Sequence, residues 1–130
     1  MSKFYDGYFD GSAIPNPGKM QCGYVIIDLN TNQWISKGNK KLGHGTNNIA
    51  EYSGLIKLLE EALWQGIYHL TVKGDSQLVI KQMNKEYKVK NEKLKKLWDK
   101  AQSLASNFET ITFEHVPREK NTFADQLTRF

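Results

Sequence analysis

Residues 4–18 read FYDGYFDGSAIPNPG, and this stretch constrains the fold more than any other part of the chain. Its first half is rich in aromatic side chains that strands prefer and that can fill a core, such as Tyr8 and Phe9. The Asp-Gly and Asn-Pro-Gly sequences that follow favour tight turns. We therefore expect a strand that ends at Asp10, with the Asp10 carboxylate held beside exposed backbone N–H groups. That placement suits a metal ligand, although Asp6 is also followed by glycine, and an Asp-Gly pair can simply begin a turn.

The composition indicates one soluble domain covering residues 1–130, with 39% hydrophobic and 25% charged residues. The single cysteine, Cys22, excludes an intrachain disulfide and a cysteine-rich zinc site. No apolar stretch is long enough to span a bilayer, and the N-terminus lacks the apolar core of a signal peptide. These features predict a cytoplasmic protein that does not associate with membranes, and we expect it to be a monomer.

Hydrophobic periodicity and turn residues predict the order β-β-β-α-β-α-α-β-α. The expected strands are residues 4–10, 20–28, 33–41, 69–73 and 109–116, and the expected helices are residues 49–65, 77–85, 92–108 and 122–128. Short connections make the first three strands an antiparallel meander. Strand–helix–strand units then give an α/β fold with a mixed sheet and helices on its faces. In such sheets, functional sites lie beyond the strand ends.

Polar residues that can bind metals fall at the predicted strand ends, namely Asp10, Asp75 and His115. Glu51 lies one turn before Leu55 on the apolar stripe of the helix over 49–65, so its carboxylate is expected on or beside the core-facing side. Each residue also has an ordinary interpretation. Asp75 can cap a helix, the stem of Glu51 can pack while its head reaches water, and His115 can be solvated at a strand end.

Four carboxylates stand out together: Asp10, Glu51, Asp75 and Asp125. Crowded carboxylates repel one another, and divalent cations with a preference for oxygen ligands remove that objection. Two Mg²⁺ ions about 3.5–4 Å apart can stabilise both the attacking and the leaving oxygens of phosphoryl transfer. The histidines lack the paired spacing of a zinc site.

Four segments resemble type 1 ribonuclease H in their order and spacing. They are DGSAIPNPG at 10–18, TNNIAE at 46–51, GDSQLVI at 74–80 and HVPREKNTFAD at 115–125. The resemblance spans nearly the whole chain and implies a ribonuclease H-like fold, a five-stranded mixed β-sheet flanked by α-helices. It implies an endonuclease that cleaves the RNA strand of an RNA–DNA hybrid and leaves 5′-phosphate and 3′-hydroxyl ends.

The same resemblance assigns roles to individual residues. The four carboxylates would hold two Mg²⁺ ions, with Mn²⁺ as a possible substitute. His115 would assist proton transfer and product release. The remaining matches are substrate contacts: Asn16, Asn47 and Gln77 toward the minor groove of the hybrid, and Thr46 toward a phosphate of the DNA strand. Amide and hydroxyl side chains suit these contacts chemically.

The chain departs from some bacterial members of that family because residues 84–91 are too few to form an extra basic helix. Lysines between Lys81 and Lys100 could partly replace it, in line with a net charge of +4 and a pI of about 9.1. Two alternatives remain open from the sequence. One is a nuclease of the same fold that acts on double-stranded RNA or a DNA intermediate, and the other is a non-catalytic nucleic-acid-binding module.

Overall fold

The computed structural model describes residues 3–122 and 124. Its strands are β1 (Tyr5–Ile14), β2 (Gly18–Asp28), β3 (Gln33–Gly45), β4 (His69–Gly74) and β5 (Thr110–His115). Its helices are α1 (Asn47–Trp64), α2 (Gln77–Met83) and α3 (Glu92–Ala105), with a short 3₁₀ helix, η1 (Arg118–Lys120). The order of these elements agrees with the sequence prediction. The predicted helix over 122–128, which carries Asp125, lies almost entirely outside the described residues.

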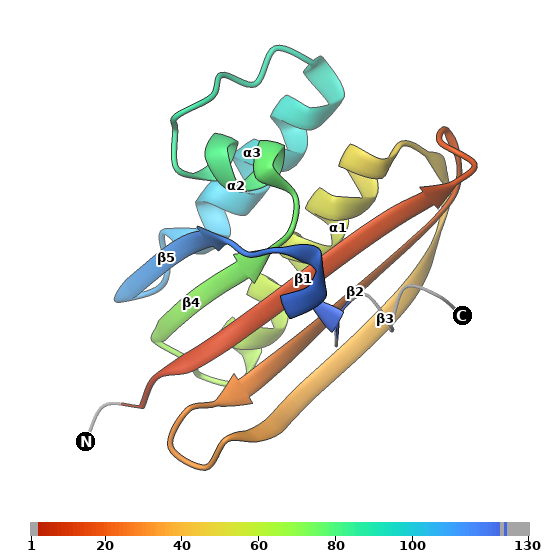
Figure 1. Ribbon diagram of the computed structural model, residues 1–130. Coiled ribbons are helices and arrows are strands. Elements are labelled where there is room, and N and C mark those ends of the chain that lie inside the picture. The colour runs from red at the N-terminus through yellow and green to blue at the C-terminus, as the bar shows by residue number, and fades with distance from the viewer. Residues whose placement is uncertain (1–2, 123, 125–130) are drawn as a thin grey trace.

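The five strands form one mixed sheet in the order β3-β2-β1-β4-β5. Strands β1, β2 and β3 pair antiparallel, as the predicted meander requires, while β1 pairs parallel with β4 and β4 with β5. Figure 1 shows α1 running along one face of the sheet, with α2 and α3 beside it on the same side. The predicted α/β class and five-stranded mixed sheet are therefore confirmed.

Strand β1 does not end at Asp10, so the sequence prediction was wrong on this point. It continues to Ile14, because β2 pairs with it along its whole length, from Tyr5 opposite Asp28 to Ile14 opposite Lys19. The third strand likewise runs beyond its predicted end and reaches Gly45. Partner strands extend both elements through residues whose local preference is for turns.

Helix α1 and the sheet enclose the main hydrophobic core. The apolar stripe predicted for this helix is buried at Leu55, Leu58, Leu59 and Ala62, all of which pack in one cluster with Phe9 of β1. Thr46 caps the N-terminus of α1, because its Oγ1 accepts a hydrogen bond from the backbone N–H of Ile49. The helix is therefore fixed in position by its buried face and its first turn.

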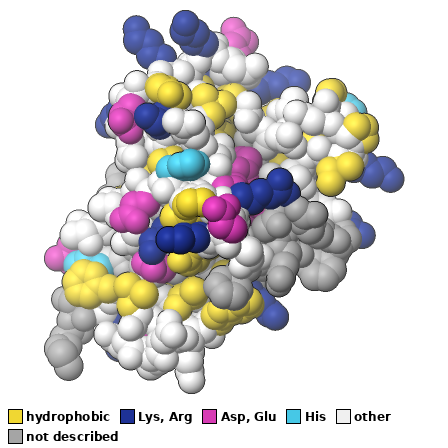
Figure 2. Space-filling model, viewed as in Figure 1, with side chains coloured by type: hydrophobic (Ala, Val, Ile, Leu, Met, Phe, Trp, Pro, Cys, Tyr) yellow, Lys and Arg dark blue, Asp and Glu magenta, His cyan; other side chains and the backbone are white. Residues whose placement is uncertain are grey.

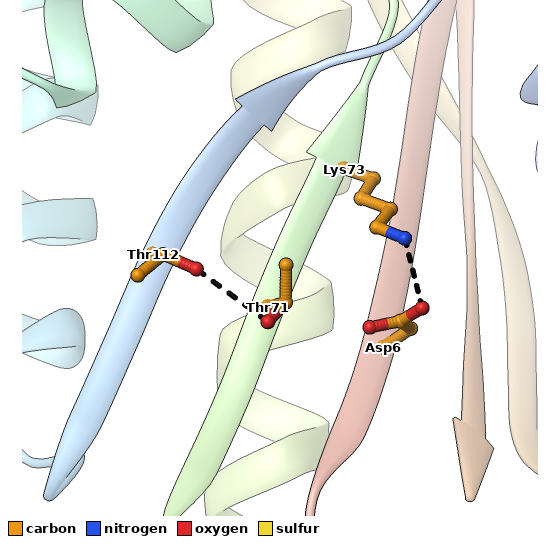
Figure 3. A network of polar contacts seen from close by, with 4 residues as sticks. All are labelled: Asp6, Thr71, Lys73 and Thr112. Atoms are coloured by element: carbon orange, nitrogen blue, oxygen red, sulfur yellow. Dashed lines mark hydrogen bonds and ion pairs between the residues drawn. The ribbon is translucent and has the colours of Figure 1, made fainter. Parts of the chain in front are cut away.

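The sheet face opposite α1 carries polar pairs that join neighbouring strands. Lys73 Nζ of β4 lies 2.9 Å from Asp6 Oδ2 of β1, and Thr112 Oγ1 of β5 lies 3.5 Å from Thr71 Oγ1 of β4 (Figure 3). Asp6 therefore forms a cross-strand ion pair, and it has no part in the acidic cluster described below. Within the described residues, no helix combines the length and apolar character needed to cross a bilayer.

Candidate active site

Three of the four predicted carboxylates meet in the structure. Asp10, Glu51 and Asp75 each contribute an oxygen, and these oxygens lie within 4.8 Å of one another. Asp10 comes from β1, Glu51 from the second turn of α1, and Asp75 from the connection between β4 and α2. The cluster therefore joins three elements that are far apart in the sequence.

The cluster forms where β1 and β4 separate. Their parallel ladder runs from Tyr5 opposite Leu70 to Tyr8 opposite Lys73 and stops there. Asp10 follows two residues later on β1, and Asp75 follows two residues later on the β4 side. The two carboxylates therefore lie just past the end of the β1–β4 ladder, and not at the end of β1 itself.

Glycines allow α1 to approach β1 at this point. A Cβ atom on Gly11 would lie 2.2 Å from the backbone of Ala50, and one on Gly54 would lie 2.5 Å from the carbonyl oxygen of Asp10. Side chains at these positions would push the helix away from the strand. Because Glu51 lies between the two contacts on α1, this close approach brings its carboxylate to Asp10.

The electrostatics of Glu51 suit a cation. Glu51 is only 6% exposed, and burial, followed by the adjacent Asp10 and Asp75 carboxylates, holds its pKa well above the ordinary range of a glutamate. Its Oε1 is buried without a hydrogen-bond partner among the described residues. A buried oxygen with no partner, beside two further carboxylates, fits a divalent cation that takes oxygen ligands.

Replacing Glu51 with glutamine is expected to stabilise the metal-free protein. The pKa of Glu51 is higher in the folded state than in the unfolded state, where it is about 4.3. As the pH rises above that value, the buried carboxyl therefore lowers the free energy of unfolding. Glu51→Gln removes this cost, so in chelator at pH 7 its melting temperature should be higher by roughly 3–6 °C, which corresponds to about 1 kcal/mol.

Thermal melts in chelator at pH 7 and pH 5 check this prediction. The difference between Glu51→Gln and the wild type should shrink at pH 5, where more of the Glu51 carboxyl is protonated. Glu86→Gln, which changes an exposed carboxylate outside the cluster, should leave the melting temperature unchanged. A Glu51→Gln variant that melts at or below the wild-type temperature would contradict the prediction.

The other two residues predicted for catalysis have different outcomes. His115 ends β5, is exposed, and its Nε2 lies 3.2 Å from the backbone oxygen of Asp75. Its ring is therefore adjacent to a member of the acidic cluster, at the rim where the sequence predicted it. Asp125 lies outside the described residues.

A cavity of about 380 Å³ surrounds the cluster and includes a residue that the sequence interpretation did not single out. Arg118 lines it together with Asp10, Glu51 and Asp75. Arg118 begins η1, three residues after His115, inside the segment that carried the family resemblance. The sequence feature that could have indicated Arg118 is its place in a polar loop near His115, a predicted site residue. An arginine at the rim of an acidic cavity can attract a phosphate.

Three of the four predicted substrate contacts lie together, and the fourth, Gln77, lies on α2. Asn47 N donates a hydrogen bond to Asn16 Oδ1, and Asn47 Oδ1 accepts one from the backbone N–H of Ala13. Thr46 is adjacent, at the start of α1. Gln77 is exposed at the start of α2, which Ser76 caps. Local hydrogen bonds therefore hold the loop that carries Asn16 against the start of α1.

A groove of about 900 Å³ extends from this loop to the start of α3. It is lined by Asn16, Thr46 and Asn47, and also by residues that the sequence did not indicate, including His44 and Lys93. Their contribution depends on the packing of α3 beside α1, which brings residues 44 and 93 to the same groove. No local sequence signal predicts that contact.

The lysines that follow α2 are exposed on the surface. Lys85, Lys88, Lys90 and Lys96 all lie in this segment and have no ion-pair partner among the described residues. Figure 2 shows Lys and Arg side chains gathered at the top of the view, over the region between α2 and α3. The structure thus leaves a positively charged surface beside the groove.

The fold and the acidic cluster define a ribonuclease H-like domain. A sequence profile of the reverse transcriptase-like family matches residues 8–130. Ribonuclease H1 of Halobacterium salinarum superposes with a TM-score of 0.92 at 35% identity, covering 95% of this chain and 93% of that one. The chain belongs to the type 1 ribonuclease H family.

Two further structures are similar over nearly the full chain. The N-terminal RNase H domain of Rv2228c from Mycobacterium tuberculosis gives a TM-score of 0.95 at 39% identity, covering 98% of this chain and 91% of the other. LC11-RNase H1, solved in complex with an RNA/DNA hybrid, gives 0.89 at 36% identity, covering 95% and 93%.

Among curated relatives, the bifunctional protein Rv2228c is 42% identical over 118 residues, which are 91% of this chain and 32% of that protein. The chain therefore spans about a third of the length of that relative. It spans 60% of ribonuclease HI of Halobacterium salinarum, at 36% identity over 120 residues.

Proposed function

We propose that this chain is a metal-dependent endoribonuclease that cleaves the RNA strand of RNA–DNA hybrids and leaves 5′-phosphate and 3′-hydroxyl ends. The single observation that carries the proposal is the meeting of Asp10, Glu51 and Asp75 within 4.8 Å of one another. A related enzyme of the same fold, LC11-RNase H1, was solved bound to an RNA/DNA hybrid, which supports the choice of substrate.

Asp10, Glu51 and Asp75 would hold Mg²⁺, with Asp125 as a fourth ligand from the C-terminal segment. The buried, unpartnered Oε1 of Glu51 and the all-oxygen donor set fit this ion. A bound pair of Mg²⁺ or Mn²⁺ ions would supply charge stabilisation for the attacking and leaving oxygens. The exposed His115 imidazole, beside Asp75, would accept or donate a proton near the cleaved bond.

The substrate would lie across the cavity and the groove. Arg118 at the cavity rim would pair with a phosphate of the cleaved strand. Asn16 and Asn47, together with Gln77 at the start of α2, would contact the minor groove, where RNA displays its 2′-hydroxyl groups. Thr46 would contact a phosphate of the DNA strand through its hydroxyl group and nearby backbone N–H groups.

Cleavage of matched duplexes tests the proposal. The chain is incubated with an end-labelled RNA–DNA hybrid, a double-stranded RNA and a double-stranded DNA of the same sequence, each with Mg²⁺ or with chelator. We expect cleavage of the RNA strand of the hybrid in Mg²⁺ alone, with 3′-hydroxyl ends on the products. Equal cleavage of double-stranded RNA would contradict the proposed specificity for hybrids. Cleavage in chelator would contradict the proposed dependence on a metal ion.

The lysines after α2 are expected to contact the phosphate backbone of either strand. Because each lysine–phosphate contact releases counterions, Lys90→Gln combined with Lys93→Gln should reduce the slope of log K against log salt by up to about 2. The variant should bind hybrids of every sequence more weakly by the same factor. Hybrid binding measured at salt concentrations between about 50 and 200 mM checks this expectation.

A control variant with Lys37→Gln and Lys40→Gln removes the same charge from β3, which is the edge strand at the opposite end of the sheet from β5. Its salt slope should match that of the wild type. Equally reduced slopes in the two variants would show that the lysines after α2 act only through net charge, and unchanged slopes in both would reject the phosphate contacts.

We also propose a cytoplasmic location, because the single cysteine, Cys22, is a buried free thiol, as is usual in a reducing compartment.

A further inference from the structure

Asn121 occupies an unusual position beside the acidic cluster. It follows η1, it is 0% exposed, and its Nδ2 donates a hydrogen bond of 2.9 Å to the backbone oxygen of Phe9. Phe9 is the first residue of β1 beyond the ladder with β4, which stops at Tyr8. The amide of Asn121 therefore bonds to β1 where β4 no longer does, one residue before Asp10.

We propose that Asn121 is a positioning residue that holds the Phe9–Asp10 peptide in place for metal binding. Its role in cleavage rests on the proposed function. The bond fixes the carbonyl that immediately precedes Asp10. It also ties the loop that carries Arg118 to β1, across 112 residues of sequence. One side chain thereby sets both the strand that supplies a ligand and the loop that lines the cavity.

The burial of Asn121 supports this role. Its Oδ1 is buried without a partner among the described residues, and such an oxygen is costly to bury. An apolar side chain would fill the same space without that cost, so packing alone does not explain an asparagine here. What an apolar side chain lacks is the donor to Phe9.

Loss of the donor would leave the buried Phe9 oxygen without its partner. The Phe9–Asp10 peptide could then rotate toward another donor, and that rotation would move the Asp10 Cα and its carboxylate. Because the three carboxylates contribute oxygens within 4.8 Å of one another, a small displacement of Asp10 would weaken the shared site. The expected effect therefore falls on metal affinity and turnover more than on hybrid binding.

Asn84 offers a matched control. Its Nδ2 donates a hydrogen bond of 3.0 Å to the backbone oxygen of Phe113 on β5, so it makes the same kind of amide-to-strand contact. Asn84 is exposed, and it does not line the cavity around the carboxylates. Removing this bond should have no consequence for the metal site.

The test compares Asn121→Leu, Asn121→Ser and Asn84→Leu with the wild type. Mg²⁺ alone is titrated while the amide signal of Gly11, whose N–H donates to Asp10 Oδ1, is followed by NMR. Cleavage of the hybrid is measured in parallel at saturating Mg²⁺. Both Asn121 variants should bind Mg²⁺ at least fivefold more weakly and lose at least tenfold in kcat, with KM for the hybrid within threefold of wild type.

Folding is checked by circular dichroism, and the serine variant carries the test if the leucine variant does not fold. A folded Asn121 variant with wild-type Mg²⁺ affinity and kcat would overturn the proposal, as would an equal loss in Asn84→Leu. If the wild type cleaves no hybrid, the proposed function fails, whereas the Mg²⁺ titration still decides the role of Asn121.

Discussion

Asp10→Asn is expected to reduce cleavage of an RNA–DNA hybrid roughly a thousandfold or more, while hybrid binding stays within a few-fold of wild type. Asparagine keeps the shape of aspartate but removes the negative charge that a divalent cation needs. Asp10 is the β1 member of the cluster, and it is only 6% exposed, so water cannot readily replace the lost ligand. Single-turnover cleavage at several Mg²⁺ concentrations, with binding measured in chelator, checks the prediction.

Asp6→Asn is the matched control for this variant. Asp6 lies on the same strand and is also followed by glycine, but it pairs with Lys73 on the polar face shown in Figure 3. Its loss should cost about 1–3 kcal/mol of stability, because it leaves the largely buried Lys73 ammonium without its charged partner, but the cleavage rate should stay within twofold of wild type. Comparable losses of cleavage in the two variants would mean that the acidic cluster has no special role.

Local patterns in the sequence predicted where Glu51 and Asp75 lie in their elements, whereas the family resemblance assigned them to the metal site. A period of 3.6 residues extends the stripe of Leu55 and Leu59 back to Glu51, and the helix obeys that period because its buried face fixes it. Asp75 follows a short strand whose end is set by the Gly74-Asp75-Ser76 sequence, and the structure ends β4 at Gly74. In both cases a local pattern determines where the side chain lies.

The rest of the site depends on contacts between distant segments. The Asp-Gly pair at Asp10 predicted a strand end, but pairing with β2 carries the strand on to Ile14. Asn121 lies in a polar stretch of the sequence, and no local pattern indicates that it is buried and bonded to Phe9. Arg118 reaches the cavity because η1 folds back toward the carboxylates. Single-sequence patterns do not contain these pairings.

The placement of Glu51 also depends on how closely α1 approaches β1, and two glycines permit this approach. Gly54 lies inside α1, where alanine is normally preferred by about 1 kcal/mol. Here a Cβ atom would lie 2.5 Å from the Asp10 carbonyl oxygen and 3.3 Å from that of Gly23. The steric conflict is with backbone atoms, which cannot rotate away as a side chain can. Gly54→Ala should therefore destabilise the protein, against the direction that helix propensity predicts.

Gly11→Ala is expected to have the larger effect, because its Cβ atom would lie 2.2 Å from both the carbonyl carbon and the carbonyl oxygen of Ala50. Helix α1 would have to move away from β1, which would open the core and withdraw Glu51 from Asp10. We expect a loss of about 3 kcal/mol or more in the free energy of unfolding, measured by urea denaturation. In the fraction that still folds, cleavage should fall at least a hundredfold.

Gly43→Ala, where a Cβ atom meets nothing within 4 Å, is the control, and its stability should stay within about 0.5 kcal/mol of wild type. If Gly11→Ala behaved like Gly43→Ala, the contact between α1 and β1 would not be what brings Glu51 and Asp10 together.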